Sequence, residues 1–226
     1  MSGRRPVVAI DGPAGAGKST VARALARRLG YRFLDTGGMY RAVAWSVRHA
    51  GLPPVDGPAL RRHLAALSIT VEGERIRIDG RDVTDELRTP ELTELTSRLT
   101  TLAAVRDAVT PLQRALAARG GIILEGRDTG TVVCPDAEVK FYLDASLETR
   151  VQRRWEDLAR SGVRQDRARV RTQVEARDRQ DTERALAPLR RAPEAIVVDT
   201  SALTVDQVVD IMADAVVGRR ECSTSS

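Results

Sequence analysis

Residues 12–19 read Gly-Pro-Ala-Gly-Ala-Gly-Lys-Ser and fit the pattern G-x-x-x-x-G-K-[ST]. A short apolar run at residues 6–10 precedes them, and apolar residues at helical spacing follow them until Gly30. A glycine loop between a strand and a helix can wrap a phosphate, because its backbone N–H groups turn inward at the positive end of the helix dipole. The pattern therefore predicts a phosphate-binding loop, and a chance glycine-rich turn is the alternative.

Lysine is rare in this chain, which makes the lysine of the loop informative. Lys18 and Lys140 are the only lysines among 36 basic residues. We expect Lys18 to contact the β- and γ-phosphates of ATP, Ser19 to ligate Mg²⁺, and Thr20 to cap or pack. The predicted ATP-binding residues are Gly12, Pro13, Ala14, Gly15, Ala16, Gly17, Lys18, Ser19 and Thr20.

Short apolar runs alternate with helix-length segments along most of the chain, which indicates an α/β fold with a buried parallel sheet. The runs that suit further strands are 33–34, 122–124, 139–143 and 195–198. The predicted helices are 91–119 with an interruption near Thr100, 147–160 behind an N-cap at Ser146, and 205–217 behind Thr204 and Gln207 at capping-box spacing.

One region departs from this alternation. Between residues 69 and 83 apolar and polar residues alternate, and Glu72-Gly73 and Asp79-Gly80 supply turn chemistry. We expect a small antiparallel β insertion there.

Positive charge is concentrated between residues 150 and 191, where 13 arginines stand against seven acidic residues. Such a segment would seek anions, although a solvated helix surface or nucleic-acid binding would also explain it. Trp155 is its only aromatic residue, so the stacking platform of a single-strand binder is lacking.

Two further segments follow predicted strands, at the sheet edge where ligands bind in this fold class. Residues 35–41 read Asp-Thr-Gly-Gly-Met-Tyr-Arg, and residues 125–130 read Glu-Gly-Arg-Asp-Thr-Gly. Arg41 and Arg127 would each make a two-pronged contact to an acceptor phosphate, or else a structural salt bridge. The Asn-Lys-x-Asp segment of a GTPase is missing.

With these segments in view, the chain resembles the bacterial cytidylate kinases, a branch of the nucleoside monophosphate kinases. The resemblance is carried by residues 10–13 running into the loop, 35–41, 126–133, 140–146 and 177–189, while Cys134 stands where an aromatic is expected. It implies a P-loop NTPase-type parallel sheet flanked by helices, with the β insertion in the acceptor-binding region and an arginine-rich helical lid. One domain spanning 1–226 is expected, with a core at about 1–35, 120–147 and 192–218, the acceptor-binding region at about 36–119, the lid at about 148–191, and a disordered tail at 219–226.

The resemblance also implies an activity: transfer of the γ-phosphoryl group of ATP to CMP or dCMP, with Mg²⁺ as cofactor. Carried over by position, Thr36, Arg41, Arg127 and Arg184 would hold the acceptor phosphate, Asp181 and Arg177 would address the sugar, and Ser97, Arg106 and Asp128 would read the base. The amino group of cytosine suits a carboxylate such as Asp128, whereas uracil presents an acceptor there.

Charge neutralisation is expected to dominate catalysis, because two anionic groups must meet. The predicted catalytic residues are Lys18, Arg127, Arg154 and Arg160, with Arg153 and Arg164 as further lid candidates; Asp128 or Asp11 would orient Mg²⁺-bound water.

Several expectations concern partners and location. The chain lacks a long apolar run, and Cys134 and Cys222 lack disulfide or zinc spacing. A cytoplasmic monomer is expected that binds nucleotides, with neither nucleic acid nor membrane as partner. The alternatives are a P-loop kinase with another nucleotide or a metabolite such as shikimate as acceptor, and a P-loop regulator or RNA-binding ATPase.

Overall fold

The computed structural model describes residues 4–224, and side chains as far as Arg219. It divides into two compact units, Met1–Arg32 with Gly120–Ser226, and Phe33–Arg119. The second unit begins three residues before the acceptor-binding region predicted from the sequence. The predicted lid and, apart from residues 33–35, the predicted core belong to the first unit. Among the described residues, none of the helices combines the length and the hydropathy that a bilayer span requires.

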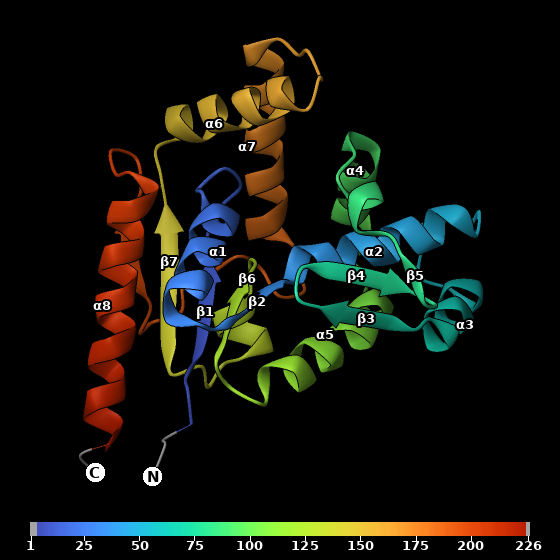
Figure 1. The fold of residues 1–226 in the computed structure, drawn as a ribbon. Helices are drawn as coiled ribbons and strands as arrows, with labels where there is room; N and C mark the ends of the chain where they lie inside the picture. The colour runs from blue at the N-terminus through green and yellow to red at the C-terminus, as the bar shows by residue number, and fades with distance from the viewer. Residues whose placement is uncertain (1–3, 225–226) are drawn as a thin grey trace. The chain divides into compact units, whose positions relative to one another are not determined.

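The first unit is built on a parallel sheet, as the sequence predicted. The central strand β1 (Val7–Asp11) pairs in parallel with β6 (Ile122–Glu125) and β7 (Val139–Asp144), and β7 pairs with β8 (Ile196–Asp199) (Figure 1). Every residue of β1 and β6 is buried, which is why both strands read as unbroken apolar runs ending in an acid. Strand β2 (Arg32–Asp35) starts in this unit, where the Arg32 N–H donates to the Gly121 carbonyl at 2.9 Å.

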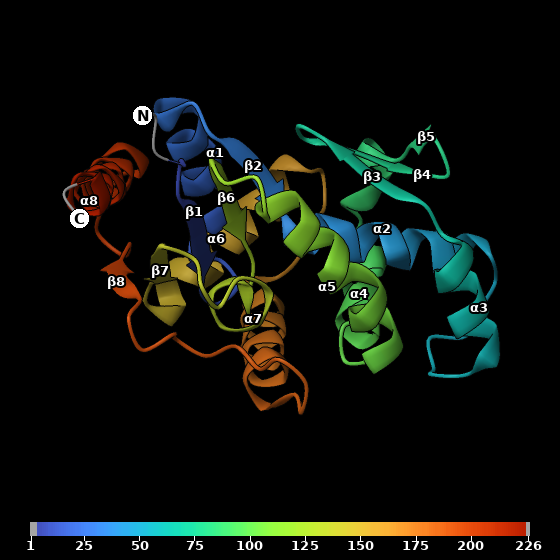
Figure 2. The ribbon, with the colours of Figure 1, turned by 90° about the horizontal axis from the view of Figure 1, so that it is seen from below.

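Helices α1 (Lys18–Leu29) and α8 (Val205–Thr224) pack together on one face of this sheet (Figure 2). The predicted capping box begins α8: Thr204 N–H donates to Gln207 Oε1 at 2.9 Å, and Gln207 N–H donates to Thr204 Oγ1 at 3.3 Å. The prediction that α8 ends at Val217 was wrong, because the helix continues to Thr224. Gly218 costs a helix only about 1 kcal/mol relative to Ala, and no proline follows it. Of the tail expected to be disordered, only residues 225–226 lie outside the described helix.

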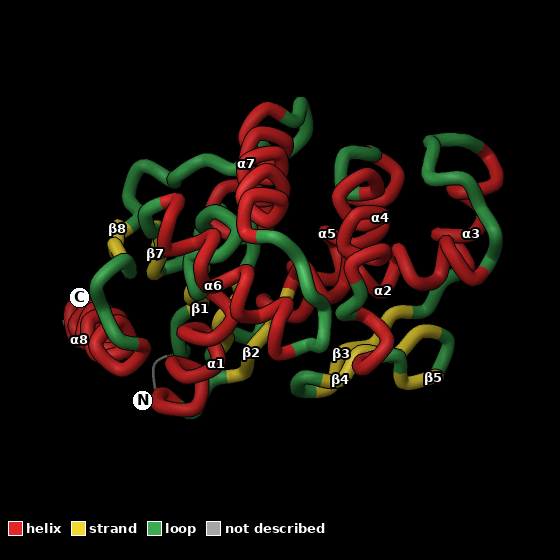
Figure 3. Tube along the Cα trace, turned by 90° about the horizontal axis from the view of Figure 1, so that it is seen from above, coloured by secondary structure: helices red, strands yellow, loops and turns green. Residues whose placement is uncertain are grey.

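Helix α6 (Leu147–Arg160) follows β7, and its Ser146 hydroxyl accepts from the Thr149 N–H at 3.2 Å, which confirms the predicted N-cap. It lies beside α7 (Arg167–Glu183), as Figures 1 and 3 both show. The two helices share a small apolar core of their own, formed by Val151, Leu158, Val170 and Val174. A short π-helix, η2 (Thr129–Val133), connects β6 toward β7.

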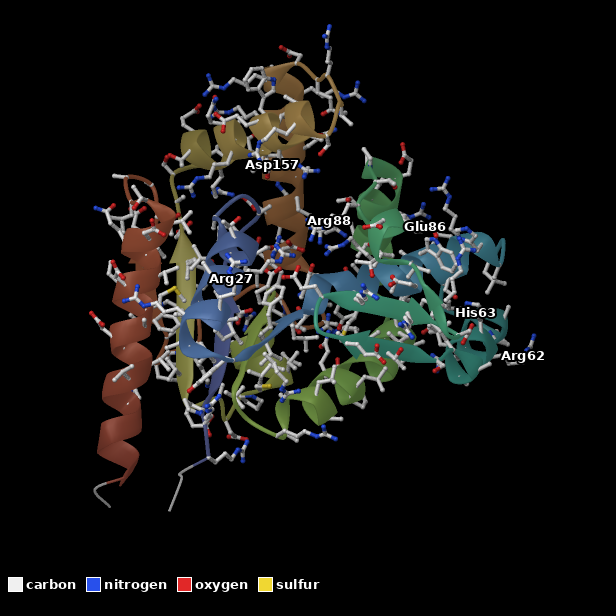
Figure 4. The ribbon with its side chains drawn as sticks, viewed as in Figure 1. Arg27, Arg62, His63, Glu86, Arg88 and Asp157 are labelled. Atoms are coloured by element: carbon white, nitrogen blue, oxygen red, sulfur yellow. The ribbon has the colours of Figure 1, made fainter. Side chains whose placement is uncertain are left out.

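The second unit contains the predicted β insertion. Strands β3 (Ile69–Glu72) and β4 (Arg75–Ile78) pair antiparallel, and β5 (Arg81–Asp82) extends the sheet beside β4. The helical elements of this unit are α2 (Thr36–His49), α3 (Pro58–Ala66), the 3₁₀ turn η1 (Thr84–Leu87), α4 (Pro90–Leu99) and α5 (Ala103–Ala117). The break between α4 and α5 falls where the sequence predicted an interruption. His63, labelled in Figure 4, joins α3 to α2 through a 2.7 Å hydrogen bond with Ser46.

Candidate active site

The loop of residues 12–19 lies between β1 and α1, as predicted, and its backbone shape depends on glycine. Gly12 has a φ of 147°, and a Cβ at this position would collide with the Leu143 carbonyl oxygen. Gly17, which has no side chain with which to cap a helix, leads directly into α1. The first N–H groups of α1 are therefore left for an anion, as a phosphate-binding loop requires.

Lys18 is buried beneath this loop. Its side-chain Nζ donates to the Pro13 carbonyl at 2.7 Å, and the residue is only 5% exposed. Burial, followed by the nearby Arg127 guanidinium, lowers the pKa of Lys18 to about 7, and Glu125, Asp11 and Asp181 partly oppose the shift. An anionic phosphate at Nζ would favour the protonated amine, so the charge of this lysine is linked to ligand binding.

Glu125, to which the sequence analysis assigned no role, completes the part of the site that faces the phosphate donor. It lies at the carboxyl end of β6, accepts a 2.6 Å hydrogen bond from the Ser19 hydroxyl and is 5% exposed. A hydroxyl and a carboxylate are hard oxygen donors, which is the ligand chemistry that Mg²⁺ prefers. The signal was present in the sequence as an acid that ends a buried strand, but only the pairing of β6 with β1 brings it to Ser19.

Asp11 is also buried, but its carboxylate is held by the protein. One oxygen accepts from the N–H and the hydroxyl of Thr129, and the other accepts from the Gly130 N–H, all at 2.8 Å. Burial raises the pKa of Asp11, and the three hydrogen bonds counteract this shift in part. These contacts favour a role in shaping the turn after β6, and they give no support to the expectation that Asp11 orients Mg²⁺-bound water.

Three of the predicted acceptor arginines meet at Asp181, which is 2% exposed. Arg127 Nε donates to Asp181 Oδ2 at 2.8 Å, Arg177 Nε donates to the same oxygen at 3.1 Å, and Arg184 Nη1 lies 4.0 Å from Oδ1. Burial alone would raise the pKa of Asp181, but the guanidiniums of Arg127 and Arg177 reverse the shift and lower it. We call these four residues the Asp181 cluster.

Asp128, predicted to read the base, adjoins this cluster. Its Oδ1 accepts from Arg184 Nη2 at 3.4 Å, and both side chains are less than 10% exposed. The first unit therefore gathers Lys18, Ser19, the Asp181 cluster and Asp128 from three separate stretches of sequence.

The predicted lid arginines lie on α6 or, for Arg164, in the segment after it, and their surroundings differ. Arg153 donates to the Thr200 hydroxyl at 2.9 Å and to the Thr200 carbonyl at 2.7 Å, so it anchors α6 to the end of β8. Arg160 pairs at 2.6 Å with the exposed Asp157, which Figure 4 labels on α6. Arg154 is half-buried and Arg164 is exposed. Outside the lid, Thr20, which the sequence analysis placed among the ATP-binding residues, is exposed on the first turn of α1.

The remaining predicted acceptor residues lie in the second unit, described by itself. Arg41 Nη2 pairs with Asp35 Oδ2 at 2.5 Å, while Asp35 Oδ1 caps α2 by accepting from the Gly38 N–H at 2.7 Å. Arg106 is 6% exposed, with its guanidinium carbon 5.7 Å from the centre of the Tyr40 ring. The other two predicted residues, Thr36 and Ser97, are buried on α2 and α4.

A phosphate loop with a buried lysine, a serine beside a strand-end carboxylate and a cluster of arginines define a P-loop phosphotransferase. Comparisons with known proteins identify the family within this class. A cytidylate kinase family profile matches residues 8–217. The chain belongs to the cytidylate kinase family, as the sequence motifs predicted.

Individual relatives agree with this family. The chain is 46% identical to a cytidylate kinase of Pelotomaculum thermopropionicum over 222 residues, covering 96% of this chain and 98% of the relative. It is 47% identical to a cytidylate kinase of Mycobacterium avium, covering 95% and 96% respectively. Among solved structures, an uncharacterized protein from Eubacterium ventriosum matches with a TM-score of 0.53 at 13% identity, covering 94% of this chain and 98% of that one. This last likeness concerns the fold.

Proposed function

We propose that this chain transfers the γ-phosphoryl group of ATP to the phosphate of CMP or dCMP, giving ADP and CDP or dCDP. One observation carries the proposal within the first unit: the charge of Arg127 lowers the pKa of Lys18. The lysine of the donor loop and an arginine of the Asp181 cluster are therefore close enough to interact electrostatically. The buried cation of Lys18 and the partly buried cation of Arg127 together form a place where two phosphate groups can approach each other.

The donor is held by the loop. ATP would place its phosphates against the backbone N–H groups of residues 12–19, with Lys18 at the β- and γ-phosphates. Ser19 and, through water, Glu125 would hold Mg²⁺, which neutralises phosphate charge when it is bound. The pKa of Lys18 is about 7, so in solutions above that pH the amine gains a proton when the phosphates bind.

The acceptor is held by arginine. Arg127 and Arg184, with Thr36 and Arg41 of the second unit, would bind the phosphate of CMP, while Arg177 and Asp181 address the sugar. The incoming phosphate oxygen attacks the γ-phosphorus, and the bond to the β–γ bridging oxygen breaks, so the negative charge moves to ADP. The acceptor phosphate is already ionised near neutral pH, so the arginines stabilise charge and a general base is not required.

Base selection is assigned to Asp128, Ser97 and Arg106. A carboxylate at Asp128 accepts from the amino group of cytosine but faces the carbonyl oxygen of uracil, and a buried mismatch of that kind leaves polar groups unpaired. The lid arginines Arg154 and Arg160 would join the transferring group when the lid closes. We further propose that the protein acts as a cytoplasmic monomer on free nucleotides, without a nucleic-acid partner.

A coupled ADP-release assay with ATP and Mg²⁺ tests the activity. CMP, dCMP, UMP, AMP and GMP are supplied separately, and we expect strong stimulation by CMP and dCMP. Stimulation by a different nucleotide would overturn the base-reading residues but keep the mechanism. Stimulation by none of them would favour a metabolite kinase or an RNA-binding ATPase, which shikimate as acceptor and a salt-sensitive RNA-binding assay would then separate.

A further inference from the structure

The tip of the donor loop is held by two helices that the phosphate-binding motif does not include. Asp178 Oδ1, on α7, accepts from the Ala14 N–H at 3.3 Å, and Arg150 Nη1, on α6, donates to the Ala14 carbonyl at 3.2 Å. Arg150 Nη1 also pairs with Asp178 Oδ2. Both main-chain polar groups of Ala14 are thus bonded to one ion pair.

This ion pair is largely shielded from water and firmly anchored. The Arg150 side chain is 10% exposed and that of Asp178 is 21% exposed. Arg150 Nε donates to the Ala145 carbonyl at 3.0 Å, which fixes the guanidinium at the start of α6. A charge-assisted pair with three further main-chain contacts holds its geometry far better than an exposed salt bridge does.

The loop also packs directly on α6. Gly15 has a φ of 79°, and a Cβ built there would lie 2.8 Å from the Arg150 carbonyl oxygen and 2.9 Å from its Cβ. The loop tip and the first turn of α6 are therefore in van der Waals contact, so a displacement of α6 or α7 must move the main chain that surrounds the phosphates.

The same turn of α7 also serves the acceptor side. Asp178 and Asp181 are three residues apart, so they project from neighbouring positions on the helix. Asp178 contacts the donor loop, whereas Asp181 accepts hydrogen bonds from Arg127 and Arg177. Helix α7 is thus a common support for both phosphate-binding groups of the first unit.

From these contacts we propose that Asp178, paired with Arg150, is a positioning residue that holds residues 13–15 in the conformation that binds the phosphates of ATP. The proposal rests on the proposed function only in naming ATP as the donor. Asp178 acts through the loop main chain and does not itself need to touch the nucleotide.

Calorimetric titration with Mg²⁺ and a non-hydrolysable ATP analogue tests this role without an acceptor. We expect Asp178→Asn and Arg150→Met each to weaken analogue binding about tenfold. The double variant is expected to lose no more than either single variant, because the two residues act as one unit. In turnover with CMP, KM for ATP should rise about tenfold while KM for CMP changes less than twofold.

Glu175→Gln is the matched control. Glu175 is an exposed acid on the same helix, three residues before Asp178, and it pairs at 3.2 Å with Arg171. We expect this variant to bind the analogue as the unmodified protein does. Thermal unfolding of every variant shows whether the fold is intact.

Three results would overturn the proposal: analogue binding by Asp178→Asn within twofold of the control, additive losses in the double variant, or an equal rise of both KM values with a lowered Tm. The last result would reduce the pair to a structural salt bridge. Failure of the unmodified protein to phosphorylate CMP would count against the proposed acceptor, and the analogue titration would still decide the role of Asp178.

Discussion

In our proposal the donor loop binds the phosphates of ATP and the Asp181 cluster binds the phosphate and sugar of the acceptor, but the two are built from different chemistry. The loop uses main-chain N–H groups and one lysine from eight consecutive residues. The Asp181 cluster uses three guanidiniums that come from the turn after β6, from α7 and from the segment after α7. The loop is local in sequence, whereas the cluster exists only in the folded chain.

The two regions also differ in how their charge responds to pH. Burial lowers the pKa of Lys18 to about 7, so its proton is gained or lost near neutral pH. Burial would also lower the pKa of Arg127, but Asp181 outweighs it and the pKa is raised, so this guanidinium stays charged. The comparison indicates that donor binding varies with pH, while the acceptor side keeps a fixed positive charge.

The largest expected effect lies on the donor side. Lys18→Ala should lower kcat about 10³-fold or more, because it removes the only side-chain cation of the loop. Steady-state turnover with CMP measures this loss. Lys140→Ala removes the other lysine of the chain, which pairs with Glu194 away from the loop, and is expected to lower Tm rather than kcat. Full activity in Lys18→Ala would refute the phosphate-loop assignment.

The Asp181 cluster is expected to give the second largest effect. Asp181→Asn removes the charge that gathers Arg127 and Arg177, and kcat/KM for CMP should fall about 10²-fold through misplacement of the guanidiniums. KM for ATP should change little. Glu183→Gln, an exposed acid on the same helix, serves as the control. An equal rise of KM for ATP would show that the cluster is not specific to the acceptor.

Base selection should give a smaller effect. Asp128→Asn should reduce the ratio of kcat/KM for CMP to that for UMP about 20-fold, since it replaces a charged acceptor by an amide that can turn either way. Parallel assays with the two nucleotides measure the ratio. Asp136→Asn, at an exposed position in the following loop, should leave the ratio unchanged. If Asp128→Asn leaves it unchanged too, Asp128 does not read the base.

The smallest expected effect is a pH dependence of donor binding. Below pH 7 Lys18 is already protonated, but above it the free amine must take up a proton to meet phosphate. The apparent affinity for Mg²⁺ and an ATP analogue should therefore fall as pH rises from 7 to 8, by at most about tenfold. Calorimetry in buffers of different ionisation enthalpy measures the proton uptake. Lys18→Arg should make the profile flat, and an unchanged slope in that variant would assign the titration to another group.

The sequence predicted the features that depend only on residues close together in the chain. The phosphate loop, the buried strands, the Ser146 cap and the capping box at Thr204 each depend on residues a few positions apart, and the structure has all of them. The end of α8 was mispredicted because a single glycine is a weak stop signal when no proline follows it.

By itself, then, the sequence determined the fold class, the donor loop and the family, and it predicted the set of arginines that we propose to bind the acceptor. Only the tertiary structure decided the partners: Ser19 with Glu125 across 106 positions, Arg127 with Asp181 across 54, and Ala14 with Asp178 across 164. The reason is physical. Local motifs follow from backbone geometry and helix spacing, whereas the contact of two distant side chains depends on sheet order and helix packing, which no short stretch of sequence contains.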